Sequence, residues 1–101
     1  MKEMSYIAAT VLHAIRSERR HGFQIMEVAG LASGTVYPAL RRLEKAGLIR
    51  ARWERETVAR SEQRPARRYY QLTREGEAAL ATAAERFRFP ELSAAGRKAA
   101  R

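Results

Sequence analysis

The sequence predicts a small α+β domain that is mostly α-helical, with three helices, a β-hairpin and a C-terminal helix. Apolar residues recur at the spacing of amphipathic helices in four stretches, and alternate with polar residues in two short stretches. A length of 101 residues allows one domain with one modest core. We therefore expect a single domain in which one hairpin interrupts a series of helices.

The first two helices are expected near the N-terminus. Apolar residues follow the i, i+3, i+4, i+7 pattern from Met4 to about Ser17. A second, shorter helix is expected from Phe23 to Ala29, and Gly30 is well placed to end it.

A third helix is expected from Ser33 to Ala46, followed by Gly47. Ser33 is a favourable N-cap, and glycine is common just after a helix C-terminus. Pro38 lacks an N–H group, so we expect it close to the helix start. On a helical wheel the buried stripe of this helix comprises Val36, Leu40 and Leu43.

A hairpin is expected after the third helix. Residues 49–54 and 69–72 alternate between apolar and polar side chains, which is typical of strands. The segment 56–66 between them is polar, rich in arginine and contains Pro65, so we expect an antiparallel hairpin with a mobile tip.

The last helix is expected to begin after Thr73 and to stop at Pro90. Thr73 is a favourable N-cap, and Glu75 would lie in the positive first turn. Residues 91–101 are rich in alanine and charge without a strong apolar stripe, so we expect a disordered tail.

Positive charge is the most informative feature of the composition. The formal net charge is +9 and the isoelectric point is near 11.0. Residues 41–68 carry ten basic and four acidic side chains, which is +6 of that net charge. A polyanion is the expected partner: DNA, RNA or an acidic membrane surface, with nucleic acid favoured.

Several classes of function are not supported. The chain has no cysteine, which excludes a disulfide scaffold, a thiolate metal site and a cysteine nucleophile. No phosphate-binding loop, nucleophile elbow or zinc-protease motif is present, and the two histidines are isolated. We expect no enzyme, no cofactor and no metal site. No apolar run could span a membrane and the first residues lack the apolar core of a signal peptide, so a cytoplasmic location is expected.

The order of elements and the position of the charge together predict a winged helix-turn-helix. A tight turn at residues 30–32 joins the second and third helices, and a basic hairpin (the wing) follows a basic third helix (the recognition helix). The major groove has room for one helix, and the wing would reach the flanking backbone or the minor groove. On the recognition helix we expect DNA contacts from Ser33, Gly34, Thr35, Tyr37, Arg41, Arg42 and Lys45. On the wing we expect them from Arg60, Arg64, Arg67 and Arg68.

Each of these interpretations has an alternative. The basic face of the third helix could be merely solvated, with Glu44 pairing to Arg41 or Arg42. Trp53 could contact a small aromatic effector, although a strand tryptophan is more often part of the core, here beneath the wing. The last helix has little left to pack on within its own chain, which favours a dimer partner. The expected dimer interface comprises Met4, Tyr6, Leu80, Ala84 and Phe87.

The residues now resemble a known family. The segment SGTVYPALRRLE at 33–44, followed by GLI at 47–49, resembles the signature of PadR-type transcriptional regulators. The hairpin exit RRYYQLT at 67–73, with Gly76 after it, is similar to the end of the wing in that family. The resemblance covers about residues 4–80.

The resemblance implies a homodimeric regulator, usually a repressor, that binds an inverted-repeat operator. In the family the first and last helices build the dimer interface, where a cavity often senses small aromatic compounds. Only one helix is expected after Thr73, so the chain resembles the short-tailed members. Residues 1–72 would be the winged helix-turn-helix domain and 73–90 the C-terminal dimerisation helix. A winged-helix module that binds RNA or docks to a protein is the alternative.

Overall fold

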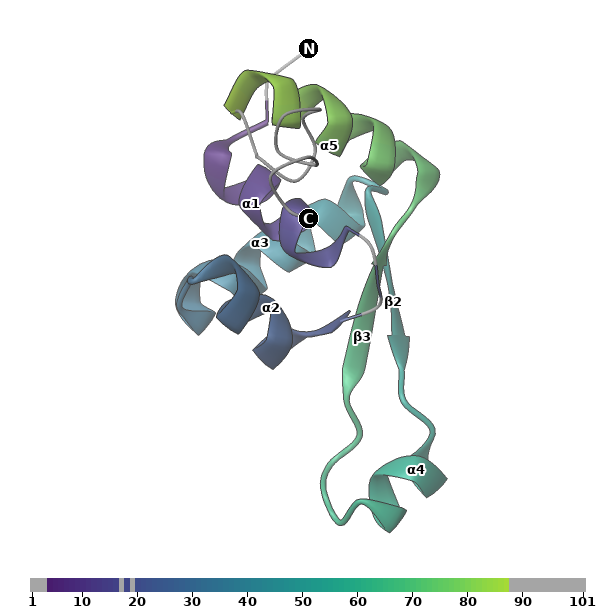
Figure 1. Ribbon diagram of the computed structural model, residues 1–101. Coiled ribbons are helices and arrows are strands. Elements are labelled where there is room, and N and C mark those ends of the chain that lie inside the picture. Colours follow the sequence, from purple (N-terminus) through teal and green to yellow (C-terminus); the bar gives the residue numbers. More distant parts are fainter. Residues whose placement is uncertain (1–3, 17, 19, 88–101) are drawn as a thin grey trace, which may run out of the picture.

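The computed structural model describes residues 4–16, 18 and 20–87 (Figure 1). The expected helix end at Pro90 and the expected tail at 91–101 lie outside the described residues. The described residues form a mostly helical α+β winged helix with five helices and three strands, which confirms the predicted fold class. In chain order they are α1 (Tyr6–Ile15), β1 (Arg20–His21), α2 (Gly22–Ala29), α3 (Ser33–Lys45), β2 (Ile49–Trp53), α4 (Glu56–Ser61), β3 (Arg68–Leu72) and α5 (Arg74–Phe87).

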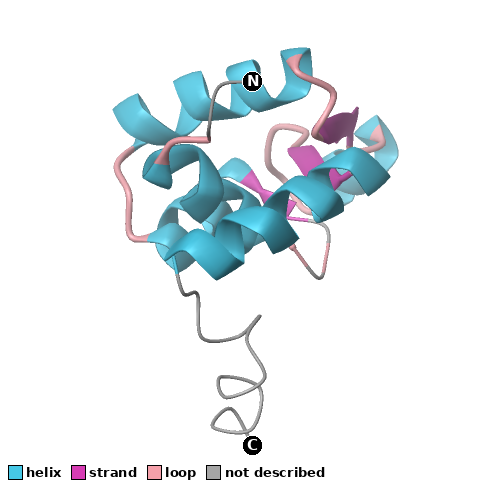
Figure 2. Cartoon of the chain, turned by 90° about the horizontal axis from the view of Figure 1, so that it is seen from above, coloured by secondary structure: helices cyan, strands magenta, loops and turns pink. Residues whose placement is uncertain are grey.

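The core lies among α1, α2, α3, α5 and one end of the sheet. Helix α1 contacts each of the other three helices, while the hairpin of β2 and β3 extends away from them (Figure 1). Seen from above, the strands take up a small part of the molecule beside the helices (Figure 2). The most deeply buried large side chains are Val11, Leu12, Ile15, Ile25, Val36 and Leu40. They come from the helical stripes that the sequence predicts.

The sheet is antiparallel with the strand order β1-β3-β2. The hairpin register runs from Ile49 opposite Leu72 to Trp53 opposite Arg68. The strand β1 was not predicted, since two residues are too short to show any alternation. Its pairing with β3 ties the start of α2 to the base of the wing.

The hairpin tip, expected as a mobile polar segment, instead contains a helix that the sequence did not predict: residues 56–61 form α4 at the end of the wing (Figure 1). Glu56 lies in the first turn and Arg60 in the last, where each suits the helix dipole. Ala59 is the buried residue of α4. One buried position in six residues gives no apolar periodicity that the sequence could reveal.

Helix α3 starts at Ser33 as expected and ends at Lys45, one residue before the expected end, but its first turn differs from the prediction. Its N-cap is Ala32 rather than Ser33, and Pro38 is the sixth residue of the helix rather than a residue of its first turn. The missing Pro38 N–H would have bonded to the carbonyl of Gly34, which is exposed, so water can satisfy that carbonyl. Gly30 and Gly47 have left-handed φ angles of 70° and 79°, as expected for the residues that end helices.

Thr73 joins the start of α5 to the turn between α3 and β2. Its hydroxyl accepts a hydrogen bond from the Gly76 N–H at 3.0 Å, which confirms the predicted cap, and donates one to the Gly47 carbonyl at 2.7 Å. Its own N–H donates to the Leu48 carbonyl at 3.0 Å. The same carbonyl faces Gly76 so closely that a Cβ there would clash with it.

Gly76→Ala should therefore lower the free energy of unfolding by about 2 kcal/mol or more, since backbone must move to admit the methyl group. Urea denaturation followed by circular dichroism measures this change. Gly34→Ala is the matched control, because open space surrounds Gly34 and alanine is the better helix former. Equal stability of the wild-type and Gly76→Ala proteins would contradict the close packing of α5 on this turn.

Candidate nucleic-acid interface

The solvent side of α3 carries a face of unpaired cations. Val36, Ala39, Leu40 and Leu43 are buried, which turns Arg41, Arg42 and Lys45 to the solvent. Within the described part of the chain, none of these three cations forms an ion pair. Of the other predicted contacts on this helix, Ser33, Gly34 and Tyr37 are exposed and Thr35 is half-buried.

Glu44 is engaged elsewhere, so the pairing of Glu44 with Arg41 or Arg42 that the alternative interpretation included is not present. Its carboxylate accepts hydrogen bonds from the Arg68 guanidinium of β3 at 3.0 and 3.3 Å. The two side chains are about one-third exposed. This ion pair ties the C-terminal half of α3 to the loop end of strand β3, where Arg68 faces Trp53.

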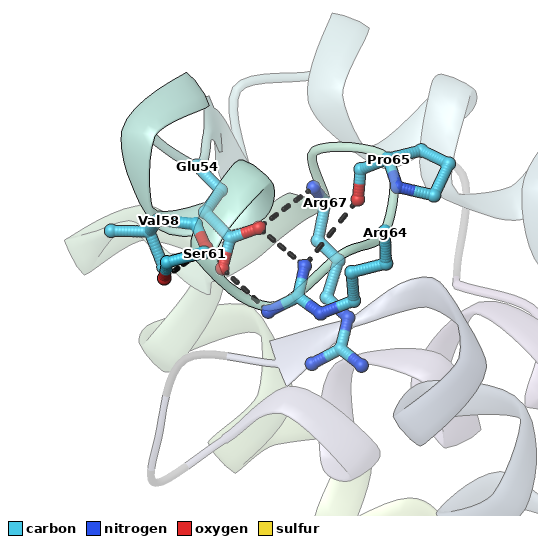
Figure 3. A network of polar contacts seen from close by, with 6 residues as sticks. All are labelled: Glu54, Val58, Ser61, Arg64, Pro65 and Arg67. Carbon is cyan, nitrogen blue, oxygen red and sulfur yellow. Dashed lines mark hydrogen bonds and ion pairs between the residues drawn. The ribbon is translucent and has the colours of Figure 1, made fainter.

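A second carboxylate closes the wing loop (Figure 3). Glu54 accepts two hydrogen bonds from the Arg64 guanidinium, at 2.5 and 2.9 Å, and a third from the Arg67 backbone N–H at 3.2 Å. Its own N–H donates to the Arg67 carbonyl at 2.7 Å. The Glu54 side chain is only 9% exposed. The hydrogen bonds from Arg64, helped by the Arg67 backbone N–H and the two nearby positive charges, lower the pKa of this carboxyl from 4.5 to about 2.

The predicted wing arginines thus have different roles. Arg64 and Arg68 are held by Glu54 and Glu44, and Arg60 makes an exposed pair with Glu56 at 3.4 Å. Arg67 forms no ion pair with a described carboxylate, and its guanidinium extends away from Glu54 (Figure 3). Arg67 is therefore the member of this set whose charge is most readily offered to a partner.

Two further cations lie on the outer face of the hairpin. Arg50 and Arg52 are exposed on β2 and border a shallow hollow with Tyr69 and Gln71 of β3. They were counted in the basic stretch of the sequence but not proposed as contacts. The period-two alternation of residues 49–54 already placed them together on one face of the strand.

Trp53 is 61% exposed, so the expectation that it belongs to the core is wrong. It is the last residue of β2 and faces Arg68 of β3 across the hairpin. The Arg68 guanidinium lies 5.5 Å from the centre of its ring, within the range of a cation–π contact. An effector contact at Trp53 stays a prediction.

The residues expected at a dimer interface fall into two groups. Leu80 and Ala84 are 3% and 6% exposed within the single chain, where α5 packs on α1. The expectation that the last helix has little to pack on is therefore wrong for these two residues. Tyr6 is exposed, and its ring meets the half-buried Phe87 edge-to-face at 5.2 Å between centroids. Met4, two residues before Tyr6, is half-buried.

Neither a metal cluster nor a membrane span occurs in the described ranges. No three histidine or carboxylate side chains there lie close enough to hold a metal ion. No described helix has both the length and the apolar character needed to cross a bilayer.

Glu54→Gln should loosen the wing loop, because it removes the charge that Arg64 binds. The folded-state pKa of Glu54 is lowered, so its contribution is complete above pH 4.5 and is lost as the pH falls towards 2. We expect the Arg67 amide of the variant to lose protection from hydrogen exchange roughly tenfold at pH 7, measured by NMR. The acid-dependent loss seen in the wild type should be absent from the variant.

Glu56→Gln is the control, since the Glu56–Arg60 pair is exposed and contributes little. His21 titrates as well: burial, Arg67 and Arg64 lower its pKa and the Glu54 charge opposes them, so the pKa of His21 should fall further in Glu54→Gln than in Glu56→Gln. Constant protection of the wild-type Arg67 amide from pH 6 to pH 2 would contradict the proposed role of Glu54.

Comparisons with known proteins agree with this arrangement. The model of the transcriptional regulator PadR-like family matches residues 11–82. A PadR family transcription regulator from hypervirulent Clostridium difficile R20291 has a TM-score of 0.72 and 28% identity, over 84% of this chain and 90% of its own. The structure of smu.1704 from Streptococcus mutans UA159 has a TM-score of 0.70 and 25% identity, over 86% of this chain and 82% of its own. A PadR family transcriptional regulator from Eggerthella lenta DSM 2243 has a TM-score of 0.65 and 25% identity, over 81% of this chain and 71% of its own.

None of the curated proteins compared with the chain matches it. The family match covers well over half of the 101 residues and includes α3 and both strands of the hairpin. The resemblance inferred from the segment at 33–49 is thereby confirmed. The chain belongs to the PadR-like family of transcriptional regulators.

Proposed function

We propose that this regulator binds double-stranded DNA in a sequence-specific manner, as a homodimer that represses transcription from an inverted-repeat operator. The observation that carries the proposal is the row of cations on the exposed face of α3 that form no ion pair with any described residue, beside a wing whose loop is fixed by Glu54. A rigid helix with free guanidinium groups suits base reading, and a fixed basic loop suits phosphate binding.

Helix α3 would enter the major groove with Arg41, Arg42 and Lys45 facing the bases. An arginine can donate two hydrogen bonds to one guanine edge, which is the most frequent specific contact in protein–DNA complexes. The N-terminal residues Ser33 and Gly34 are exposed at the start of α3, where free N–H groups favour a phosphate.

The wing would bind the backbone and the adjacent minor groove. Arg67 offers an unpaired guanidinium, while Arg64 and Arg68 hold the loop and the strand that carry it. Phosphate contacts fix the register of a protein on the duplex without reading its sequence. Sequence discrimination should therefore come from α3, and sequence-independent affinity from the wing.

Dimerisation would involve the surface formed by the start of α1 and the end of α5. Tyr6 is exposed there, with Met4 and Phe87 half-buried around it. A two-fold dimer implies half-sites about one helical turn, or a multiple of it, apart. A small aromatic effector that changes the distance between the two α3 helices would release the DNA. The regulator would act in the cytoplasm, where it meets the DNA.

Selection of bound duplexes from a random pool tests this proposal. One palindromic duplex should emerge and should outcompete bulk DNA by roughly 10³-fold or more at physiological salt. Equal binding of the wild type to random duplex and to RNA would refute the proposal and favour the RNA-binding alternative.

Arg41→Ala and Arg67→Ala should have different effects on the selected duplex. Arg41→Ala should reduce discrimination against mismatched sites, with a loss of about 1–3 kcal/mol at one position. Arg67→Ala should weaken binding to all duplexes similarly and reduce the slope of log K against log[salt] by about one. Fluorescence anisotropy of labelled duplexes measures both effects, and unchanged discrimination in Arg41→Ala would show that the face of α3 is wrongly assigned.

Tyr6→Glu should convert the dimer to monomers, because it buries a charge in an apolar interface. Sedimentation velocity measures the oligomeric state. Val58→Glu is the control, since Val58 is exposed on α4 at the far end of the wing. A dimer that persists in Tyr6→Glu would contradict an interface at this surface.

A further inference from the structure

An aromatic groove lies between the start of α2, the recognition helix and the wing. It has a volume of about 620 Å³ and is open to the solvent. Phe23 of α2 and Trp53 of β2 are 59% and 61% exposed, and both border it, as does Tyr37 of α3. Large exposed aromatic side chains gathered in one hollow favour a site that another molecule covers.

The groove is continuous with the surface assigned to DNA binding. Tyr37 belongs both to the exposed part of α3 and to the groove wall, and Arg67 and Arg68 line the wall on the wing side. The Tyr37 ring lies directly against Gly22, so closely that a Cβ at Gly22 would clash with it. This contact holds Tyr37 between the two helices as a fixed part of the wall.

We propose that this groove receives one sugar-phosphate strand of the DNA, with Phe23 and Trp53 packed on deoxyribose rings and Arg67 on a phosphate. The inference rests on the proposed function and adds to it two residues, Phe23 and Trp53, as sequence-independent DNA contacts. When α3 lies in the major groove and the wing reaches the adjacent minor groove, the strand that separates these grooves must lie between them. The aromatic groove is the hollow at that place.

The chemistry of the wall suits such a strand. No carboxylate is among the lining residues of the groove, and Arg67 lines it without an ion pair to a described carboxylate, whereas Glu54 and Glu44 offset the charges of Arg64 and Arg68. A phosphate therefore meets positive charge there, while the apolar faces of the deoxyribose rings meet Phe23 and Trp53. Covering these rings removes apolar surface from water, which gives a favourable term that does not depend on base sequence.

Trp53 provides a direct probe, because it is the one tryptophan in the chain. A mixed-sequence duplex of about two helical turns, roughly 20 bp, should protect its fluorescence from quenching by acrylamide in low salt. Binding is monitored in parallel by anisotropy of the labelled duplex. If the duplex binds but Trp53 stays as accessible to acrylamide as in the free protein, the groove does not hold the strand.

Phe23→Ala tests the second contact. It should weaken binding to any duplex about fivefold to tenfold and leave the salt slope unchanged, because no charge is lost. Val28→Ala is the matched control, since Val28 is 54% exposed on the same helix but lines a different hollow. Thermal denaturation of both variants checks that folding is intact.

The outcomes separate this inference from the function on which it rests. No duplex binding by the wild type, even in low salt, would refute both. Sequence-specific binding with an accessible Trp53 and a normal Phe23→Ala variant would refute the inference alone. Protection of Trp53 by benzoate but not by duplex would also overturn it, because the groove would then be a ligand site. Protection by duplex together with the Phe23→Ala loss would support it.

Discussion

Burial of the apolar stripe of α3 is the constraint on which the rest of the structure depends. Val36, Leu40 and Leu43 pack among α1, α2 and the sheet, and they contribute to the single core of the described residues. Once this stripe is buried, the rotation of the helix is fixed, and Arg41 and Lys45 must face the solvent. The core therefore sets the direction of the cations as well as the stability of the fold.

The wing is held by a different kind of interaction, because it extends beyond the helices that could bury it. Its tip has one buried residue, Ala59, so apolar packing contributes little there. The Glu54 carboxylate holds the loop instead, because it binds both the Arg64 guanidinium and the Arg67 backbone N–H. A side chain that is largely shielded from water makes such hydrogen bonds stronger than they would be on an open surface. The ion pair between Glu44 of α3 and Arg68, at the loop end of β3, connects the helices packed by apolar contacts to the loop held by polar ones.

The sequence was sufficient for features that depend on local pattern. The helical stripes, the left-handed glycines at 30 and 47 and the Thr73 cap each follow from a short run of residues, and all are present. Features that depend on distant partners could not be predicted. Glu54 and Arg64 are ten residues apart and Glu44 and Arg68 twenty-four, so no periodicity links them. Trp53 was misjudged for the same reason, since its exposure depends on how far the hairpin extends beyond the helices.

The fixed wing loop also has a consequence for the thermodynamics of association. A flexible loop would lose backbone freedom when it meets DNA, at a cost of roughly 1–2 kcal/mol for each residue that becomes ordered. Here the backbone N–H and carbonyl of Arg67 are both hydrogen-bonded to Glu54 before any partner binds. That ordering entropy is lost during folding rather than during binding, so the loop gains affinity through preorganisation instead of through additional charge.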